Sequence, residues 1–283
     1  MKIRFIVKKL GKMMAALPVA LVLVCSQTLM GQTVAFKNAT EAIQAAQEKG
    51  QYLFLLFYDK RAELYYDNSE ELFKEMKIAI DDFRNKSSEK ILFQKVLITD
   101  DKEKGIVSKY KIQSSRLPEL LILAPNGAVT GLFPKRVTAQ NFAQSIVSKL
   151  TMAILKSIQK EKMALVLMQN NSTKYNNESS KAAEEFANDP RIKKGTVDII
   201  KADPADNEVK KFLAQIKEEK PISESTVVLI ASPGSVTGVY SGIDIKEKLL
   251  GLLPSSSAAS STSVIGSKCG TGAGSSGGCC GSK

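Results

Sequence analysis

Residues 117–131 read LPELLILAPNGAVTG, and residues 224–238 read ESTVVLIASPGSVTG. Each stretch has a continuous apolar run of strand length, then a tight turn, then a second run that ends at a glycine. The turns are Ala-Pro-Asn-Gly and Ser-Pro-Gly-Ser, and proline and glycine at these positions indicate a hairpin. Two copies of one supersecondary unit within 283 residues predict two similar domains in tandem.

The residues before the first hairpin alternate between helical and strand patterns. A helix that starts near Asn38 is expected to end at Gly50. The continuous apolar run of residues 52–57 predicts a strand buried on both faces. Apolar residues at helical spacing predict a helix over 68–83, and a second strand is expected over 91–98. A short helix over 102–110 would then lead into the hairpin.

One long helix is predicted after the first hairpin, over residues 138–160. Apolar residues recur there at every fourth position, from Phe142 to Ile158. The second unit then repeats the order of the first, with expected strands at 164–168 and 195–200, helices ending near Asn188 and Ile216, the second hairpin, and a last helix before Pro254.

These patterns divide the chain into four parts. Residues 34–160 are predicted to be the first domain and residues 161–253 the second. Residues 254–283 are rich in serine, glycine and alanine, so they bury too little apolar surface to offset the entropy of ordering and are expected to be a flexible tail.

Residues 1–31 have the three parts of an export signal. A basic start is followed by an apolar core over residues 13–24, and Ser26 to Gly31 is polar with small residues. This order predicts a signal peptide and an exported protein, whether periplasmic, at the cell surface or secreted. The alternative is an uncleaved anchor, because the apolar run is near the lower limit for spanning a membrane.

Composition excludes several chemistries. The chain has no histidine, so Ser-His-Asp and Cys-His catalytic systems and histidine-containing zinc sites cannot form within it. No cysteine lies between residues 26 and 268. The net charge is +11, but basic residues are not interleaved with aromatics, so nucleic acid is not predicted as a partner. No phosphate-binding loop or dinucleotide fingerprint occurs, and no cofactor is implied.

The order helix, strand, helix, strand, helix, hairpin, helix resembles the thioredoxin-like superfamily. The most similar segment is Tyr110 to Leu123, which looks like the short helix, cis-proline and central strand of that family. The resemblance implies an α/β fold with a central mixed sheet flanked by helices in each domain. It also implies a cis peptide bond at Leu117-Pro118, because cis bonds are nearly always X-Pro bonds. The second unit has Ser225 in place of this proline.

Thiol chemistry in this family needs a Cys-x-x-Cys pair at a helix N-terminus, where the helix dipole lowers the pKa of the first thiol. The corresponding connections here, residues 58–66 and 169–177, contain no cysteine. Redox catalysis within either folded domain is therefore excluded. The resemblance then points to members without these cysteines, such as the non-catalytic domains of protein disulfide isomerases and the domains of calsequestrin, which bind proteins or ions or act as spacers.

The resemblance places a candidate peptide-binding groove at Leu117 and Pro118, with Tyr58, Tyr65 and Tyr66 beside it. In the family, the backbone before the cis-proline pairs with an extended peptide, which is binding by strand addition. A protein or peptide partner is therefore expected. The alternative is that the proline and the tyrosines only stabilise the fold.

The tail holds a second candidate site, Cys269, Cys279 and Cys280. In an oxidising compartment these thiols would pair, cross-link two chains into a disulfide-linked oligomer or attach the protein to a surface. Three thiolates can also capture a soft metal ion, or serve as the redox centre of a thiol-disulfide oxidoreductase. The alternative is a tail whose cysteines form adventitious disulfides.

Overall fold

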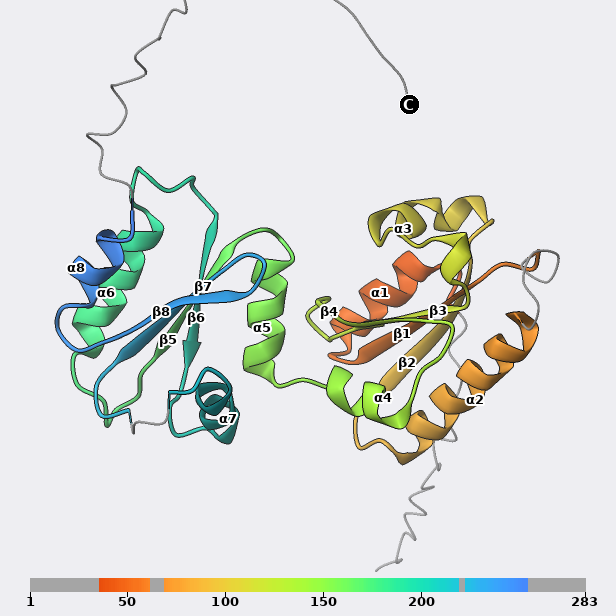
Figure 1. Ribbon diagram of the computed structural model, residues 1–283, viewed down its shortest axis with the longest axis horizontal. Coiled ribbons are helices and arrows are strands. Elements are labelled where there is room, and N and C mark those ends of the chain that lie inside the picture. The colour runs from red at the N-terminus through yellow and green to blue at the C-terminus, as the bar shows by residue number, and fades with distance from the viewer. Residues whose placement is uncertain (1–35, 62–68, 219–221, 254–283) are drawn as a thin grey trace, which may run out of the picture. The chain divides into compact units, whose positions relative to one another are not determined.

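A computed structural model describes residues 36–61, 69–218 and 222–253 (Figure 1). The predicted signal peptide, the tail with its three cysteines, Tyr65 and Tyr66 lie outside these residues. The elements in chain order are α1 (Ala39–Glu48), β1 (Tyr52–Tyr58), α2 (Ser69–Lys86), β2 (Ile91–Leu97), the 3-10 helix η2 (Asp101–Glu103), α3 (Lys104–Lys109), the 3-10 helix η3 (Ser114–Arg116), β3 (Glu119–Leu123), β4 (Val129–Pro134), α4 (Ala139–Ser145), α5 (Lys149–Ile158), β5 (Met163–Met168), α6 (Asn176–Ala187), β6 (Val197–Ala202), α7 (Asn207–Gln215), β7 (Thr226–Ala231), β8 (Ser235–Ser241) and α8 (Ile245–Leu250).

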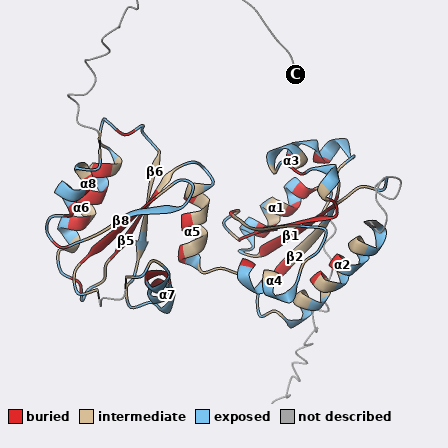
Figure 2. Ribbon diagram, viewed as in Figure 1, coloured by how far each residue is buried: buried red, intermediate tan, exposed pale blue. Residues whose placement is uncertain are grey.

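The first domain is built on a four-stranded mixed sheet with the strand order β2-β1-β3-β4. Strand β1 runs parallel to β2 and antiparallel to β3, and the hairpin pairs β3 with β4. The central strand β1 is buried over almost its whole length (Figure 2). The continuous apolar run that predicted this strand is thus confirmed, since a strand with helices on both faces needs apolar residues at every position.

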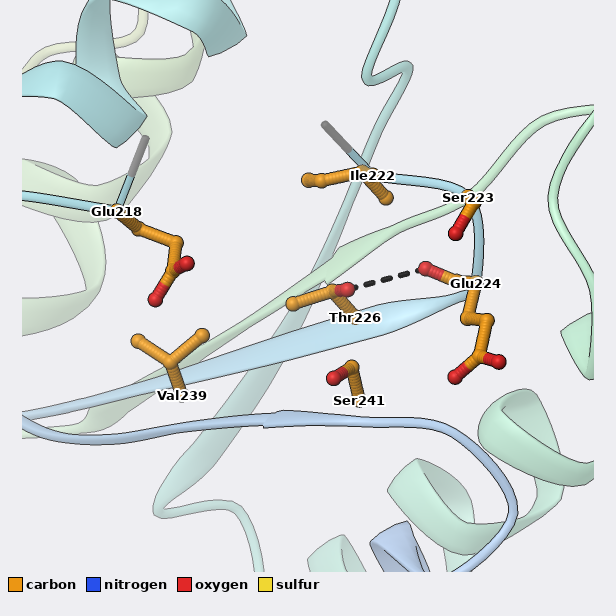
Figure 3. Close-up of a pocket in the computed structure, with 7 residues that line it drawn as sticks. All are labelled: Glu218, Ile222, Ser223, Glu224, Thr226, Val239 and Ser241. Atoms are coloured by element: carbon orange, nitrogen blue, oxygen red, sulfur yellow. Dashed lines mark hydrogen bonds between the residues drawn. The ribbon is translucent and has the colours of Figure 1, made fainter. Parts of the chain in front are cut away.

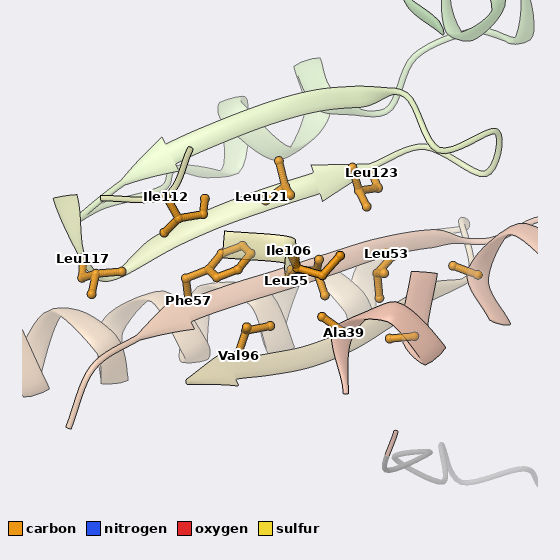
Figure 4. Close-up of a cluster of buried hydrophobic side chains, with 12 residues drawn as sticks. Ala39, Leu53, Leu55, Phe57, Val96, Ile106, Ile112, Leu117, Leu121 and Leu123 are labelled. Atoms are coloured by element: carbon orange, nitrogen blue, oxygen red, sulfur yellow. The ribbon is translucent and has the colours of Figure 1, made fainter. Parts of the chain in front are cut away.

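Helices cover both faces of this sheet. On one face, Ala39 of α1 and Ile106 of α3 pack with Leu55, Phe57 and Leu121 (Figure 4). On the other face, α2 and α4 pack on the side chains that point the opposite way, among them Phe54, Leu56 and Leu120. Alternate residues of β1 and β3 therefore supply two separate apolar layers.

The start of α1 is fixed from two sides. The Asn38 side chain accepts a hydrogen bond from the Glu41 N–H at 2.9 Å, which confirms the predicted cap. The buried Glu103 carboxylate accepts the Ala39 N–H at 3.0 and 3.2 Å from across the domain. Burial raises the pKa of Glu103, and the hydrogen bond from Ala39 opposes that shift.

The second domain repeats the first. Its sheet has the order β6-β5-β7-β8, with β5 parallel to β6 and antiparallel to β7. Helices α5 and α7 pack on one face, and α6 and α8 pack on the other. The repeat extends to details of the hairpins: the space over Gly131 is filled by the ring of Phe133, and the space over Gly238 by the ring of Tyr240.

The predicted single helix over residues 138–160 is wrong. The structure has two helices, α4 and α5, with extended backbone at Ile146 and Ser148 between them. The Ser148 hydroxyl accepts the Thr151 N–H at 3.1 Å and so starts a new helix. The periodicity hid this break because α4 buries Phe142 against the first sheet and α5 buries Leu150 and Ile154 against the second.

Tyr52 holds the connection between α4 and α5. Its hydroxyl accepts the Val147 N–H and donates to the Val147 carbonyl, both at 3.0 Å. Only 3% of this residue is exposed. Burial raises the pKa of the Tyr52 hydroxyl, so it remains a neutral donor.

Replacing Tyr52 with phenylalanine is expected to lower the free energy of unfolding by about 1–3 kcal/mol, because both backbone groups of Val147 lose this partner. Chemical denaturation followed by circular dichroism measures the change. Tyr110→Phe is the matched control, since its hydroxyl takes part in no hydrogen bond among the residues that the structure describes. Equal losses for the two variants would show that the hydroxyl of Tyr52 contributes nothing.

Two cis peptide bonds occur in the described residues, Leu117-Pro118 and Ser232-Pro233. The first was expected and is confirmed, whereas the second was not predicted. Within the same residues, no helix is both long and apolar enough to cross a membrane.

Candidate peptide-binding edge

The predicted site lies where η3 turns into β3. Leu117 has extended backbone, and its side chain packs in the core with Ile112 and Phe57 (Figure 4). Leu117 is 4% exposed, and Pro118 is also buried. A partner at this position can therefore reach the backbone, but not these two side chains.

The backbone groups of this edge are only partly paired. The Arg116 N–H donates to Gln113 at 3.0 Å, the Leu117 N–H donates to Ser114 at 3.3 Å, and the Pro118 carbonyl accepts from Lys135 at 2.6 Å. Pro118 has no N–H to donate. Among the described residues, no donor pairs with the carbonyls of Arg116 and Leu117. Within the described residues, these two carbonyls are left as acceptors for an added strand.

Tyr58 lies at the end of β1, one residue beyond the point where Phe57 pairs with Glu119. Its ring packs on Phe73 of α2, with the ring centres 5.1 Å apart, and the residue is half-buried. The strand register thus places Tyr58 opposite Pro118, and its ring lies on the face of the sheet that α2 covers. It gives no position for Tyr65 and Tyr66.

A buried charge next to Pro118 was not anticipated from the sequence. The Glu119 side chain is 1% exposed, and its Oε1 lies 2.7 Å from a guanidinium nitrogen of Arg116. Neither carboxylate oxygen of Glu119 accepts a hydrogen bond from a described residue, so its contact with Arg116 is an ion pair. Burial raises the pKa of Glu119, and the positive charge of Arg116 lowers it. The only signal in the sequence was one acid within an apolar strand.

The corresponding region of the second domain contains Ser223, Glu224 and Ser225. Strand register places Ser225 where the first domain has Pro118, because Thr226 begins β7 as Glu119 begins β3. A cavity of about 500 Å³ lies beside it (Figure 3). It is lined by Glu218, Ile222, Ser223, Glu224, Thr226, Val239 and Ser241. In the described part of the chain, no three histidine, cysteine or acidic side chains gather to hold a metal ion.

Comparison with known proteins gives structural matches only: no family model and no curated protein matches the chain. The first two thioredoxin domains of Saccharomyces cerevisiae Eps1p align at 12% identity over 78% of this chain and 96% of that one, with a TM-score of 0.28. The zinc-bound form of human ERp44 aligns at 14% identity over 77% of this chain and 57% of that one, with a TM-score of 0.35. The DsbH oxidoreductase covers 52% of this chain and 95% of that one at 11% identity, with a TM-score of 0.30.

The fold itself follows from the topology. Each domain has one parallel and two antiparallel strand pairs in the same order, with helices on both faces, and the first has a cis-proline directly before its central antiparallel strand. By this topology, the described chain consists of two tandem α/β domains, each with a thioredoxin-like fold.

Proposed function

We propose that this is an exported, non-catalytic thioredoxin-like protein whose first domain binds an extended polypeptide along the backbone of Arg116 and Leu117. The observation that carries the proposal is the pair of carbonyls at this edge, which accept no hydrogen bond from any described residue. An extended chain can donate to such carbonyls as an added strand. Since backbone groups make these contacts, the site would accept many sequences.

The cysteine distribution supports a binding role over thiol catalysis. No cysteine occurs between residues 26 and 268, which includes every described residue of both domains. A polypeptide bound at Leu117 would therefore meet no attacking thiolate from the first domain. Residues 1–31 would direct export, and Cys269, Cys279 and Cys280 would tether the protein or cross-link two copies.

Fluorescence anisotropy tests the binding site with the full chain and a labelled polypeptide that has been reduced and carboxymethylated, so that it stays unfolded and carries no thiol. Saturable binding is expected. Tyr58→Ala should weaken it by about 10-fold, the effect of removing an aromatic contact worth about 1.4 kcal/mol. Tyr110→Ala, which alters another half-buried tyrosine, should leave the affinity unchanged. An affinity that both variants change equally, or no binding at all, would contradict the proposal.

A competing function is thiol-disulfide exchange by the tail, for which the adjacent pair Cys279 and Cys280 is the specific observation. We expect the full chain to promote reduction of the insulin disulfides no faster than the variant with both cysteines replaced by serine. Insulin reduction by dithiothreitol, followed by turbidity, measures this. Activity that requires Cys279 and Cys280 would establish the competing function.

Metal capture by the tail cysteines is tested separately. Stoichiometric zinc binding by the full chain that is lost on truncation at Pro254 would establish it.

A further inference from the structure

Among the residues that the structure describes, the two domains differ in how the backbone before the central antiparallel strand is hydrogen-bonded. In the second domain, the loop between β5 and α6 reaches this backbone. The Lys174 N–H donates to the Ser223 carbonyl at 3.1 Å, and the Ser225 N–H donates to the Lys174 carbonyl at 2.8 Å. These two bonds form a parallel bridge between Lys174 and Glu224. One residue of the chain therefore occupies the edge as a partner strand would.

The remaining acceptor of this edge is also used. The Thr226 hydroxyl donates to the Glu224 carbonyl at 3.0 Å (Figure 3). Ser225 is completely buried, and Thr226 is 5% exposed. Every acceptor that corresponds to the carbonyls of Arg116 and Leu117 is thus satisfied inside the second domain, so an incoming strand would have to break bonds before making its own.

A polar network holds the loop in this position. The Thr173 hydroxyl lies within hydrogen-bond distance of two acceptors, the Asn170 carbonyl and, at 2.6 Å, the side-chain oxygen of Asn176. The Asn170 side chain donates to Asp203 at 2.7 Å, which ties the loop to the end of β6. Tyr175 has a φ of 62°, a left-handed conformation that non-glycine residues adopt at a cost. This cost is offset by the contacts that the loop gains.

The bridge depends on the residue that replaces Pro118. Ser225 has an N–H and donates it to Lys174, whereas proline at the matching position has none. In the first domain a bridge with both bonds cannot form, whatever the loop before α2 does. The exchange of proline for serine therefore accompanies the change from an edge whose carbonyls have no donor among the described residues to one that is closed.

We infer that the second domain is closed to extended polypeptides by its own Lys174, so that each chain binds one such segment, in the first domain. This inference rests on the proposed function for the number bound, but the bridge itself can be tested without any ligand. In the free full chain, the amides of Lys174 and Ser225 should exchange with deuterium at least about 100-fold more slowly than the amide of Asn171, in the same loop. Equal rates would overturn the inference, whether or not a polypeptide binds.

Two variants test the consequence for binding. Lys174→Pro removes the donor to Ser223, whereas Lys174→Ala keeps the N–H and changes only the exposed side chain. With the carboxymethylated polypeptide as the probe, calorimetry should give one bound segment per chain for the wild type and Lys174→Ala, and two for Lys174→Pro. Two segments on the wild type would refute closure while leaving the proposed function intact. No binding to the wild type would refute the proposed function, and the exchange rates would still decide whether the edge is closed.

Discussion

Replacing Phe54 with alanine is expected to lower the free energy of unfolding of the first domain by about 3–5 kcal/mol, the range for truncating a buried aromatic side chain. Phe54 is fully buried in β1, and its ring stacks on Phe142 at 5.6 Å and on Phe83 at 6.2 Å. Phe83 and Phe142 stack on each other at 4.7 Å, so the three rings join β1, α2 and α4. Alanine would leave a cavity that the other two rings fill only in part.

Hydrogen exchange measures this effect where it occurs. Protection of the β1 and β3 amides should fall, while the β5 and β7 amides, which belong to a separate core, should retain more of theirs. Ile78→Ala is the control. Ile78 lies on α2, the helix that carries Phe83, but it is 68% exposed, so its replacement should change stability by less than about 0.5 kcal/mol. Similar losses for the two variants would contradict the packing described for this core.

Replacing Arg116 with alanine is expected to cost about 2–3 kcal/mol at pH 8, because it leaves the buried Glu119 carboxylate without its counter-charge. The value lies below that for a fully buried pair because the Arg116 side chain is 39% exposed, so water already screens the interaction. Without the guanidinium, burial alone acts on Glu119 and raises its pKa further above the ordinary value of 4.5.

The cost should therefore depend on pH in a defined direction. A carboxyl group with a raised pKa in the folded state binds its proton more tightly there, so stability is gained as pH falls through the folded pKa and is lost as pH rises through it. The destabilisation by Arg116→Ala should be largest above the folded pKa of Glu119 and should shrink toward pH 4.5. Urea titrations at several pH values measure this trend.

A second substitution serves as the control for the charge. Glu119→Leu in the Arg116→Ala background removes the buried carboxylate and should recover stability at pH 8, since an apolar side chain of similar size suits this site. A loss that is independent of pH, or one that Glu119→Leu deepens, would mean that Arg116 acts through packing rather than through its charge.

The sequence allowed the strands and turns to be predicted, because these depend on local chemistry. The apolar run at residues 52–57 and the proline and glycine of the two hairpins each constrain the backbone directly, and the structure has β1, β3–β4 and β7–β8 at these places. The break between α4 and α5 could not be found in the same way. Both helices bury apolar faces, so the periodicity continued across residues that are extended.

The details of the candidate site depend on tertiary contacts. The 3-10 turn of η3 brings Arg116 back to Glu119, and nothing in the apolar pattern around Leu120 marks that pair. Similarly, the presence of Ser225 where the first domain has Pro118 was visible in the sequence, but the hydrogen bond that its N–H makes was not. Only the position of the loop at Lys174 shows that the serine N–H is used.

The carbonyl carbon of Arg116 offers the most direct measurement of polypeptide binding by the first domain. Its chemical shift responds to hydrogen bonds that the carbonyl accepts, and it can be followed through the amide of Leu117 in a labelled full chain. On titration with the carboxymethylated polypeptide, we predict a saturable downfield shift at Arg116 and no change at Ser223, its counterpart in the second domain. An Arg116 signal that stays constant while the polypeptide binds would contradict an added strand at this edge.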